Sequence, residues 1–392
     1  MKKLGILIFT FILLICSLEQ KNISAREHLG IITDHLSISS PSAILIEFTT
    51  GTIIYEKNSS EKMYPASMTK MMAMYLFLEK IDDGTYSFED TITVSAYASS
   101  MGGSQIFLKE NEKMSFKDLF KAVTIASAND AVVALAEYTY GSIEEFISEM
   151  NNQAYEFGMT NTNFINTTGF HDPNHYTTAH DMSILARKLL TDYGETILSY
   201  TSIYDTYLRE NSSSPFWLVN TNKMIKTYQG MDGLKTGYTS DSGFNLTATA
   251  TRNGMRLISV VMGAQTSQKR NSDTATMLDL GFNNYKVINI YNKNDPITTH
   301  TFESSKYSNT EIVAKENVTY LIKKNESLDN IKIEIKIDIS QAPVRSDQII
   351  GTMTLTNPNS TISSTFNLYA REDVPRLNFI DILKRYWMIL LA

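Results

Sequence analysis

The run of residues 67–81 constrains the fold more than any other feature of this sequence. It is dense in Met, Leu and Ala and contains neither proline nor glycine. Apolar residues therefore fall on almost every side of a helix, which predicts a helix buried on most of its faces. Pro65, just upstream, is typical of a helix start. Such a helix must be surrounded by other elements, and 392 residues, 43% of them hydrophobic, suffice for two or three domains with cores of this kind.

Strand patterns lie on both sides of this helix along the chain. Residues 42–55 contain two β-rich runs around Thr49-Thr50-Gly51, which predicts a hairpin. Residues 245–251 and 256–263 are rich in β-branched side chains and flank Asn253-Gly254, a favoured hairpin turn. An early hairpin and a late set of strands can join in one antiparallel sheet.

Helical periodicity dominates the chain between these strands. It is found in residues 116–139, where the polar group at 127–130 interrupts it, and again in 143–157 and 181–193. Residues 161–180 are polar and rich in turn formers, so we expect a loop there. The predicted fold class is therefore α+β, an antiparallel sheet with helices packed around it.

The residue pattern of the sequence changes near Lys286. Short β-rich runs separated by turn residues follow, at 318–322, 331–337 and 349–355, and helical periodicity is absent. We therefore expect a small all-β domain over residues 286–373, after a first domain over residues 26–285.

The amino-terminal segment has the pattern of a secretory signal. Two lysines follow Met1, residues 4–15 are almost entirely apolar, and a polar stretch ends at Arg26. Residues 1–25 are thus predicted to be a signal peptide cleaved after Ala25, with an uncleaved anchor as the alternative. Cys16 is the only cysteine, so the mature chain would have no disulfide, thiol nucleophile or thiolate metal site. In either case the protein is expected outside the cytoplasm.

The last residues, 374–392, differ from the rest of the chain. Apolar side chains at helical spacing, Trp387 among them, alternate with charged ones. This pattern predicts an amphipathic helix that lies in the interface of a membrane and anchors the protein to its surface. The alternative is a helix docked on the β domain. The net charge of −7, without a basic stripe, argues against a nucleic-acid partner.

One pair at the start of the buried helix has the residue types of a nucleophile and its base. Ser67 and Lys70 are three residues apart and would share one face of a helix. A neutral Lys70 could accept the hydroxyl proton of Ser67. Spacing alone is weak evidence, because Ser59 and Lys62 repeat it a few residues upstream.

Two further polar groups have ordinary explanations when they are considered separately. Ser127-Ala128-Asn129 could cap a helix or line a cleft. Lys235-Thr236-Gly237, at the start of a predicted strand, could form a surface turn or hold a carboxylate, and Gly237 would permit close approach of a backbone.

Together, and in this order, the three groups resemble the signature of serine penicillin-binding proteins and serine β-lactamases, Ser-x-x-Lys, Ser-x-Asn and Lys-Thr-Gly. The resemblance is to the low-molecular-mass penicillin-binding proteins, which are D-alanyl-D-alanine carboxypeptidases, and it covers nearly the whole chain. The matching stretches are P-A-S-M-T-K, S-A-N-D-A, F-I-N-T-T-G, H-Y-T-T-A-H-D, N-T-N-K-M and D-G-L-K-T-G-Y-T. Two departures, Phe170 after Gly169 and Ser242, bear on loop packing and substrate preference.

The resemblance implies a β-lactamase/transpeptidase-like catalytic domain, a β-rich domain and a C-terminal anchoring helix. It also implies a role for each site residue. The catalytic residues would be Ser67 as nucleophile, Lys70 as base, Ser127 as proton relay and Asn129, which positions Lys70 and the substrate amide; the substrate-binding residues would be Lys235, Thr236, Gly237, Tyr238 and Arg270. The backbone N–H groups of Ser67 and Tyr238 would form the oxyanion hole.

Base function at Lys70 requires an unusual pKa. An ordinary lysine, with a pKa near ~10.4, is a poor base at neutral pH. Burial and the nearby positive charge of Lys235 would both lower the pKa of Lys70.

The implied substrates are peptidoglycan stem peptides, with β-lactam antibiotics as covalent inhibitors. A class A β-lactamase needs a glutamate between the second and third motifs, and residues 157–194 contain none. A DD-endopeptidase, a transpeptidase, an esterase and a silent cell-wall-binding scaffold of the same fold remain as alternatives. The three histidines of one loop, His171, His175 and His180, show no recognisable metal-ligand pattern, so no metal and no cofactor are expected.

Overall fold

The computed structural model describes residues 36–210, 212–358, 360, 362–383 and 387. The predicted signal peptide, residues 1–25, lies outside the described residues, as does part of the C-terminal tail. The chain divides into two compact units. The described residues up to Val287, with Lys323–Asn325, form the first unit, and Ile288–Ile322 with the described residues from Glu326 onward form the second.

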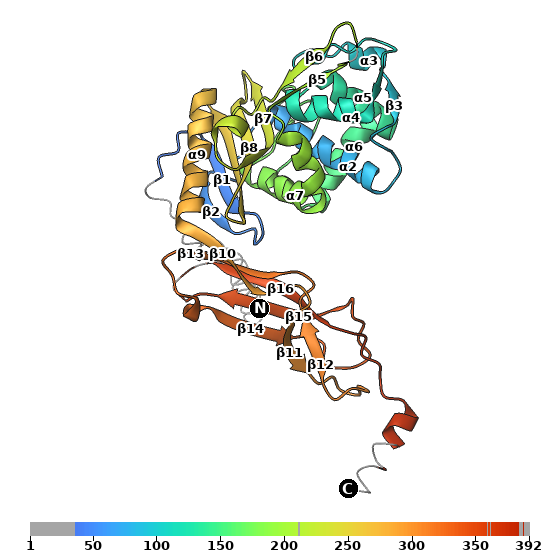
Figure 1. Cartoon of the computed structure of the whole chain (residues 1–392), viewed down its shortest axis with the longest axis vertical. Coiled ribbons are helices and arrows are strands. Elements are labelled where there is room, and N and C mark those ends of the chain that lie inside the picture. Colours follow the sequence, from blue (N-terminus) through green and yellow to red (C-terminus); the bar gives the residue numbers. More distant parts are fainter. Residues whose placement is uncertain (1–35, 211, 359, 361, 384–386, 388–392) are drawn as a thin grey trace, which may run out of the picture. The chain divides into compact units, whose positions relative to one another are not determined.

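An antiparallel sheet forms the centre of the first unit (Figure 1). Its strand order is β2-β1-β9-β8-β7. The bounds are β1 (Ser42–Glu47), β2 (Ile53–Lys57), β7 (Met231–Thr239), β8 (Gly243–Arg252) and β9 (Met255–Ala264). The early hairpin and the late strands thus share one sheet, as the sequence predicted, and the turn at Asn253 and Gly254 has φ angles of 51° and 78°.

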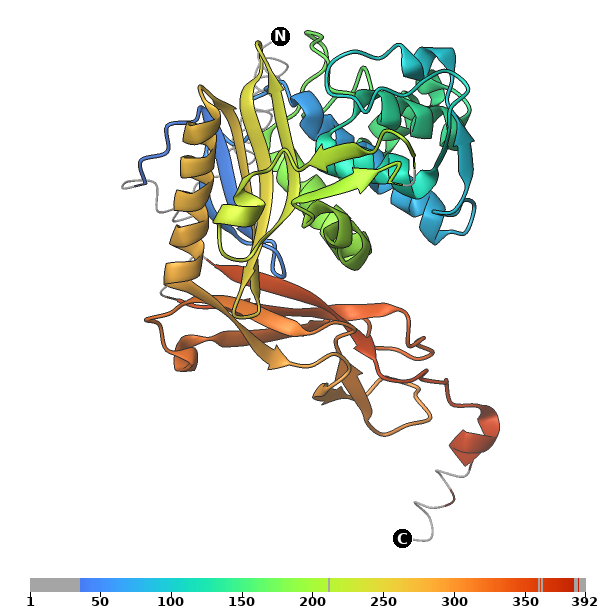
Figure 2. The same cartoon turned by 45° about the horizontal axis from the view of Figure 1, so that its top comes forward.

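Helices cover both faces of this sheet, α9 on one and α7 with α2 on the other (Figures 1 and 2). The helical elements are α2 (Lys70–Asp82), α3 (Ala96–Ser99), α4 (Phe116–Lys121), α5 (Asn129–Tyr140), α6 (Ile143–Glu156), α7 (Ala179–Thr201), α8 (Met224–Thr227) and α9 (Ser267–Asn284), together with a 3-10 turn, η1 (Ala66–Thr69), and a π-helical turn, η2 (Ala122–Ala126). The α+β prediction is confirmed.

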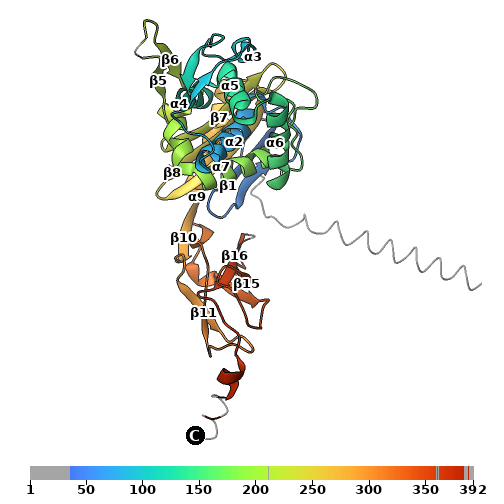
Figure 3. The ribbon, with the colours of Figure 1, turned by 90° about the vertical axis from the view of Figure 1, so that its right-hand side faces the viewer.

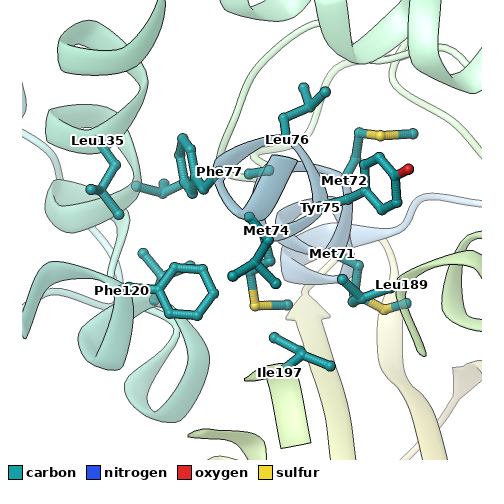
Figure 4. Packing of buried hydrophobic residues seen from close by; sticks show 14 of the residues in the cluster. Met71, Met72, Met74, Tyr75, Leu76, Phe77, Phe120, Leu135, Leu189 and Ile197 are labelled. Carbon is teal, nitrogen blue, oxygen red and sulfur yellow. The ribbon is translucent and has the colours of Figure 1, made fainter. Parts of the chain in front are cut away.

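Helix α2 lies at the centre of the largest core. Its residues from Lys70 to Leu78 are all buried. Figure 4 shows Met71, Met72 and Met74 of this helix among side chains from other helices, including Phe120 and Leu189. Met is flexible enough to fill an irregular core on every side, which accounts for the all-round apolar pattern of the sequence.

Several elements differ from the expectations. The helix expected over 181–193 continues to Thr201, because the chain kinks at Tyr193 (φ −131°) and then resumes helical geometry. Helix α9 was not expected, since its buried residues are few and its polar residues many. Two small two-stranded sheets were also missed, β3 (Thr91–Thr93) with β4 (Lys113–Ser115) and β5 (Asp205–Leu208) with β6 (Phe216–Val219).

The second unit is built from strands, as predicted. A five-stranded sheet has the order β11-β12-β16-β15-β14, and β10 pairs with β13. The bounds are β10 (Tyr285–Tyr291), β11 (Pro296–His300), β12 (Thr310–Val313), β13 (Val318–Lys323), β14 (Lys332–Ile337), β15 (Ile349–Thr356) and β16 (Ser363–Ala370), with a 3-10 turn, η3 (Leu328–Asn330). Alternate side chains of β16 are buried, so one face of the sheet covers a separate core around Phe302, Tyr320 and Met353.

Candidate active site

Ser67 lies in the 3-10 turn η1, immediately before α2, and not inside the α-helix as the sequence suggested. The preceding Ala66 has a φ of 48°, a left-handed conformation that costs a non-glycine residue about 1 to 2 kcal/mol. Strain of this kind is concentrated at functional sites. The turn is held from outside, since the buried Asn245 donates from Nδ2 to the carbonyl of Tyr64 at 2.9 Å.

Two glycines allow other segments to approach this turn closely. A Cβ atom on Gly169 would overlap the Ala66 carbonyl oxygen and lie 2.9 Å from the Ser67 nitrogen. A Cβ atom on Gly237 would lie well inside contact distance of the Pro65 carbonyl oxygen. The nucleophile turn is therefore packed between the loop of Gly169 and strand β7.

The Lys70 amino group contacts Ser67 directly. Its Nζ donates to Ser67 Oγ at 3.0 Å and to the Thr168 carbonyl at 2.7 Å. The side chain is fully buried. Burial and the positive charge of Lys235 hold the pKa of Lys70 well below its usual value, while Asp130 acts in the opposite direction. A lysine in this environment gives up its proton more readily than an ordinary lysine, which favours action as a base.

Ser127 follows the π-helical turn η2 and has a φ of 63°. It is 3% exposed, and its Oγ has no hydrogen-bond partner among the described residues. π-Helical turns often mark functional sites, and a buried hydroxyl without a partner is a further indication of a functional role.

Asn129 is the first residue of α5 and is also buried. Its Nδ2 donates to the Gly102 carbonyl at 2.7 Å, and its Oδ1 has no partner among the described residues. The described residues make no hydrogen bond between Asn129 and Lys70. The next residue, Asp130, accepts from the backbone N–H groups of Ile106 and Leu108, both at 3.0 Å, which ties the start of α5 to the neighbouring loop.

The Lys-Thr-Gly group lies in the middle of β7, not at the start of a strand as expected. Lys235 Nζ donates to the Thr236 carbonyl at 3.1 Å, and Thr236 Oγ1 donates to Thr221 Oγ1 at 2.7 Å. Tyr238, two residues further, is 57% exposed and stacks on Phe244, with 4.3 Å between ring centroids.

Arg270 reaches the same region from α9. It is 6% exposed and donates from Nη2 to Asn271 Oδ1 at 2.8 Å. Burial lowers the pKa of Arg270 to about 10. Burial, followed by the charge of Arg270, lowers the pKa of Lys235 to about 7. Two buried cationic groups that repel each other form a site for an anion.

The competing pair Ser59 and Lys62 has different surroundings. Ser59 Oγ donates to the Glu56 carboxylate, and Lys62 Nζ lies 4.0 Å from the centroid of the Tyr176 ring. Neither side chain contacts the other in the hydrogen bonds or salt bridges of the described residues. Local spacing was the same in both pairs, and the tertiary structure distinguishes them.

The loop histidines do not gather around a common point. His175 is buried between Thr69 Oγ1, 2.8 Å from Nε2, and the Ile165 N–H, which donates to Nδ1 at 3.0 Å. Burial lowers the pKa of His175 to about 4. No cluster of metal-ligating side chains occurs in the part of the chain that the structure describes.

Sequence reasoning missed three contributors to the site, namely the Thr168 carbonyl, the Thr221 hydroxyl and the Asp130 carboxylate. All three lie in stretches that carry the family resemblance, N-T-T-G, N-T-N-K-M and S-A-N-D-A. A position in such a stretch indicates that a residue is functionally important. Its role becomes clear only from the contacts that it makes in the structure.

A buried lysine hydrogen-bonded to a serine in a strained turn, beside an anion site, defines a serine acyltransferase or hydrolase of the penicillin-recognising class. Comparison with known proteins identifies the family within this class. Residues 30–266 match the family of D-alanyl-D-alanine carboxypeptidases, and residues 285–376 match the C-terminal domain of penicillin-binding protein 5. The chain belongs to the D-alanyl-D-alanine carboxypeptidase family.

Individual relatives align with this protein over most of the chain. The D-alanyl-D-alanine carboxypeptidase DacF of Bacillus subtilis is 43% identical over 90% of each chain. DacC of Escherichia coli is 32% identical over 81% of this chain and 80% of its own. The structure of penicillin-binding protein 5 from Haemophilus influenzae has a TM-score of 0.78 at 30% identity, and the match covers 86% of this chain and 98% of that one.

A further solved structure matches a smaller part of the chain. Penicillin-binding protein D2 from Listeria monocytogenes, in its ampicillin-bound form, has a TM-score of 0.57 at 31% identity. The match covers 63% of this chain and 99% of that one.

Proposed function

We propose that this protein is a serine-type D-Ala-D-Ala carboxypeptidase that removes the terminal D-alanine from peptidoglycan pentapeptides through an acyl-enzyme on Ser67. The observation that carries the proposal is the contact of 3.0 Å between Lys70 Nζ and Ser67 Oγ, in a setting that lowers the pKa of Lys70.

The proposed reaction begins with proton transfer from Ser67 to neutral Lys70. Ser67 Oγ attacks the carbonyl carbon of the penultimate D-alanine, and the tetrahedral oxyanion accepts hydrogen bonds from the backbone N–H groups of Ser67 and Tyr238, each typically worth roughly 3 kcal/mol. Ser127 relays a proton to the departing D-alanine nitrogen. Water then hydrolyses the ester and restores the Ser67 hydroxyl.

The terminal carboxylate of the substrate would bind to Lys235, Thr236 and Arg270. The pairing of a carboxylate with two buried cations relieves their mutual repulsion and stabilises their charged forms. The substrate amide would provide partners for the side chains of Ser127 and Asn129, whose buried oxygens have none among the described residues. These roles agree with those that the family resemblance implies.

A β-lactam ring would acylate Ser67 in the same way, and its adduct should persist. The class A β-lactamases use a glutamate to activate the water that releases it, and residues 157–194 lack one. We expect mass spectrometry to detect a penicilloyl adduct on Ser67 for much longer than one turnover with peptide. Release within seconds would instead favour a β-lactamase.

The proposed location is the outer face of the cytoplasmic membrane. Residues 1–25 would direct export, 26–285 and 286–373 would be the catalytic and β-rich domains, and 374–392 would lie in the membrane interface. Described residues of the tail, including Phe379, Ile380, Leu383 and Trp387, are exposed, as expected for such a surface. Among the helices that the structure describes, none has the length and apolar content to cross a bilayer.

Muropeptide analysis of a deletion strain tests the physiological reaction. Accumulated pentapeptides, reversed by the wild-type gene and not by Ser67→Ala, would support the carboxypeptidase. Unchanged pentapeptides with altered cross-links would favour a DD-endopeptidase. A folded protein that leaves both unchanged and is not labelled by fluorescent penicillin would be a silent scaffold.

The pKa of Lys235, about 7, predicts an alkaline limb in the pH profile. A neutral Lys235 cannot pair with a carboxylate, so kcat/KM for a peptide with a free C-terminus should fall about tenfold per pH unit well above pH 7. On the acid side, the rate should fall as Lys70 becomes protonated. The measurement is kcat/KM from about pH 5 to about pH 10.

The matched control for this profile is Lys235→Arg, because a guanidinium stays charged throughout the range. We expect this variant to lose the alkaline limb, whatever its absolute rate. An unchanged alkaline limb in Lys235→Arg would assign the limb to another group.

A further inference from the structure

The hairpin of β5 and β6 carries a pair of exposed aromatic side chains that the catalytic scheme does not use. Tyr207 and Trp217 are directly opposite each other in the two strands and are 48% and 55% exposed. Residues opposite each other in an antiparallel pair point to the same face, with Cβ atoms about 5 Å apart. Figure 3 shows the hairpin at the edge of its unit.

The other face of the hairpin is anchored in the protein. Leu208 and Leu218 are both 1% exposed, and a register slip of one residue would move them into solvent. The outward direction of Tyr207 and Trp217 is therefore set by the same register that buries the leucines. Two large aromatic rings held side by side in solvent are typical of a binding surface.

The chemistry of this face suits a sugar. Trp217 Nε1 donates to Asp205 Oδ2 at 2.9 Å, which fixes the indole and places a carboxylate beside it. No ring contact between Tyr207 and Trp217 is found among the described aromatic pairs, so each ring can offer a face to a ligand. Aromatic faces pack on the C–H face of a pyranose ring, and the neighbouring carboxylate can accept its hydroxyl groups.

The hairpin also lies at a suitable distance along the chain from the anion site. Strand β6 ends at Val219, and Thr221, two residues later, accepts the hydrogen bond of Thr236. The four residue-to-residue steps from Trp217 to Thr221 span at most about 13 Å. An extended pentapeptide spans at most about 17 Å. The indole side chain of Trp217 extends beyond the backbone and covers part of the difference between these two lengths.

We propose that Tyr207, Trp217 and Asp205 form a subsite for the amino sugar to which the stem peptide is attached. This inference rests on the proposed function for its choice of ligand. The sugar at one end of the substrate would stack on the two rings while the carboxylate at the other end lies against Thr236. The subsite would make the enzyme favour glycan-linked peptides over free ones.

Fluorescence provides a test that does not depend on catalysis. The chain has two tryptophans, so Trp387→Phe leaves Trp217 as the single reporter. In this full-length protein, titration with the β-1,4-linked trimer of N-acetylglucosamine should change the emission saturably. Adding Tyr207→Ala should weaken binding at least about fivefold, whereas Tyr155→Ala, at a more exposed tyrosine of α6, should not. No saturable change, or a change with lipid vesicles and none with the sugar, would overturn the subsite.

Kinetics provides the second test. Wild-type kcat/KM should be about tenfold higher for a disaccharide-pentapeptide than for the free pentapeptide, and Trp217→Ala should reduce this ratio to about one. A ratio equal in both proteins would contradict the inference. A protein that hydrolyses neither substrate would refute the proposed function instead, and the fluorescence titration would still decide the subsite.

Discussion

Replacement of Ser67 by alanine is expected to abolish both release of D-alanine and labelling by fluorescent penicillin. Lys70 would then have no hydroxyl to deprotonate and no bond to the substrate could form. The loss of kcat should be on the order of 10⁶-fold, typical for removal of a catalytic serine. Folding should persist, because the change removes one hydrogen bond, worth about 1 kcal/mol net, and Lys70 keeps its hydrogen bond to the Thr168 carbonyl.

The chain offers its own control for this variant. Ser59 has a lysine at the same spacing, and its Oγ donates to Glu56. Ser59→Ala should label with penicillin at the wild-type rate, and thermal unfolding of both variants should show that they are folded. Labelling of folded Ser67→Ala, with a mass shift elsewhere on the chain, would refute Ser67 as the nucleophile.

Substitution of Gly169 by alanine is expected to inactivate the enzyme without touching a reacting group. The new Cβ atom would overlap the Ala66 carbonyl oxygen and lie 2.9 Å from the Ser67 nitrogen. The nucleophile turn or the loop must then move, and this displaces both the hydroxyl and the proposed oxyanion donor. A misplacement of about 1 Å can cost about 10²-fold in rate, so kcat/KM should fall at least that much.

Gly158→Ala separates this effect from backbone strain. Gly158 has a φ of 74°, close to the 85° of Gly169, and a Cβ atom there would meet nothing within 4 Å. Both variants should lose about 1 to 2 kcal/mol of folding free energy from the left-handed backbone. Only Gly169→Ala should lose penicillin acylation. Equal acylation rates in the two variants would show that the turn tolerates the displacement.

Particular elements show how much of the fold could be predicted from the local sequence. The all-round apolar run of α2 and the Asn253-Gly254 turn were read correctly, because burial on every face and left-handed turns impose residue choices within a few positions. Helix α9 was not anticipated, since most of its residues are polar and its buried residues include Arg270, Asp273 and Thr274, which leaves no clear apolar stripe in the sequence. The extension of α7 beyond Tyr193 was not predicted, because the chain leaves helical geometry at Tyr193 and then resumes it.

The candidate site was likewise predicted in part from the sequence and decided in part by the tertiary structure. The sequence by itself determined the residue types, their order and hence the family, because a nucleophile, a base and an anion-binding strand need these groups in these stretches. The tertiary structure alone decided that Lys70 lies 3.0 Å from Ser67 Oγ and that Lys62 meets an aromatic ring. Burial and the approach of Lys235, which lower the pKa of Lys70, arise from long-range packing, and local spacing does not encode them.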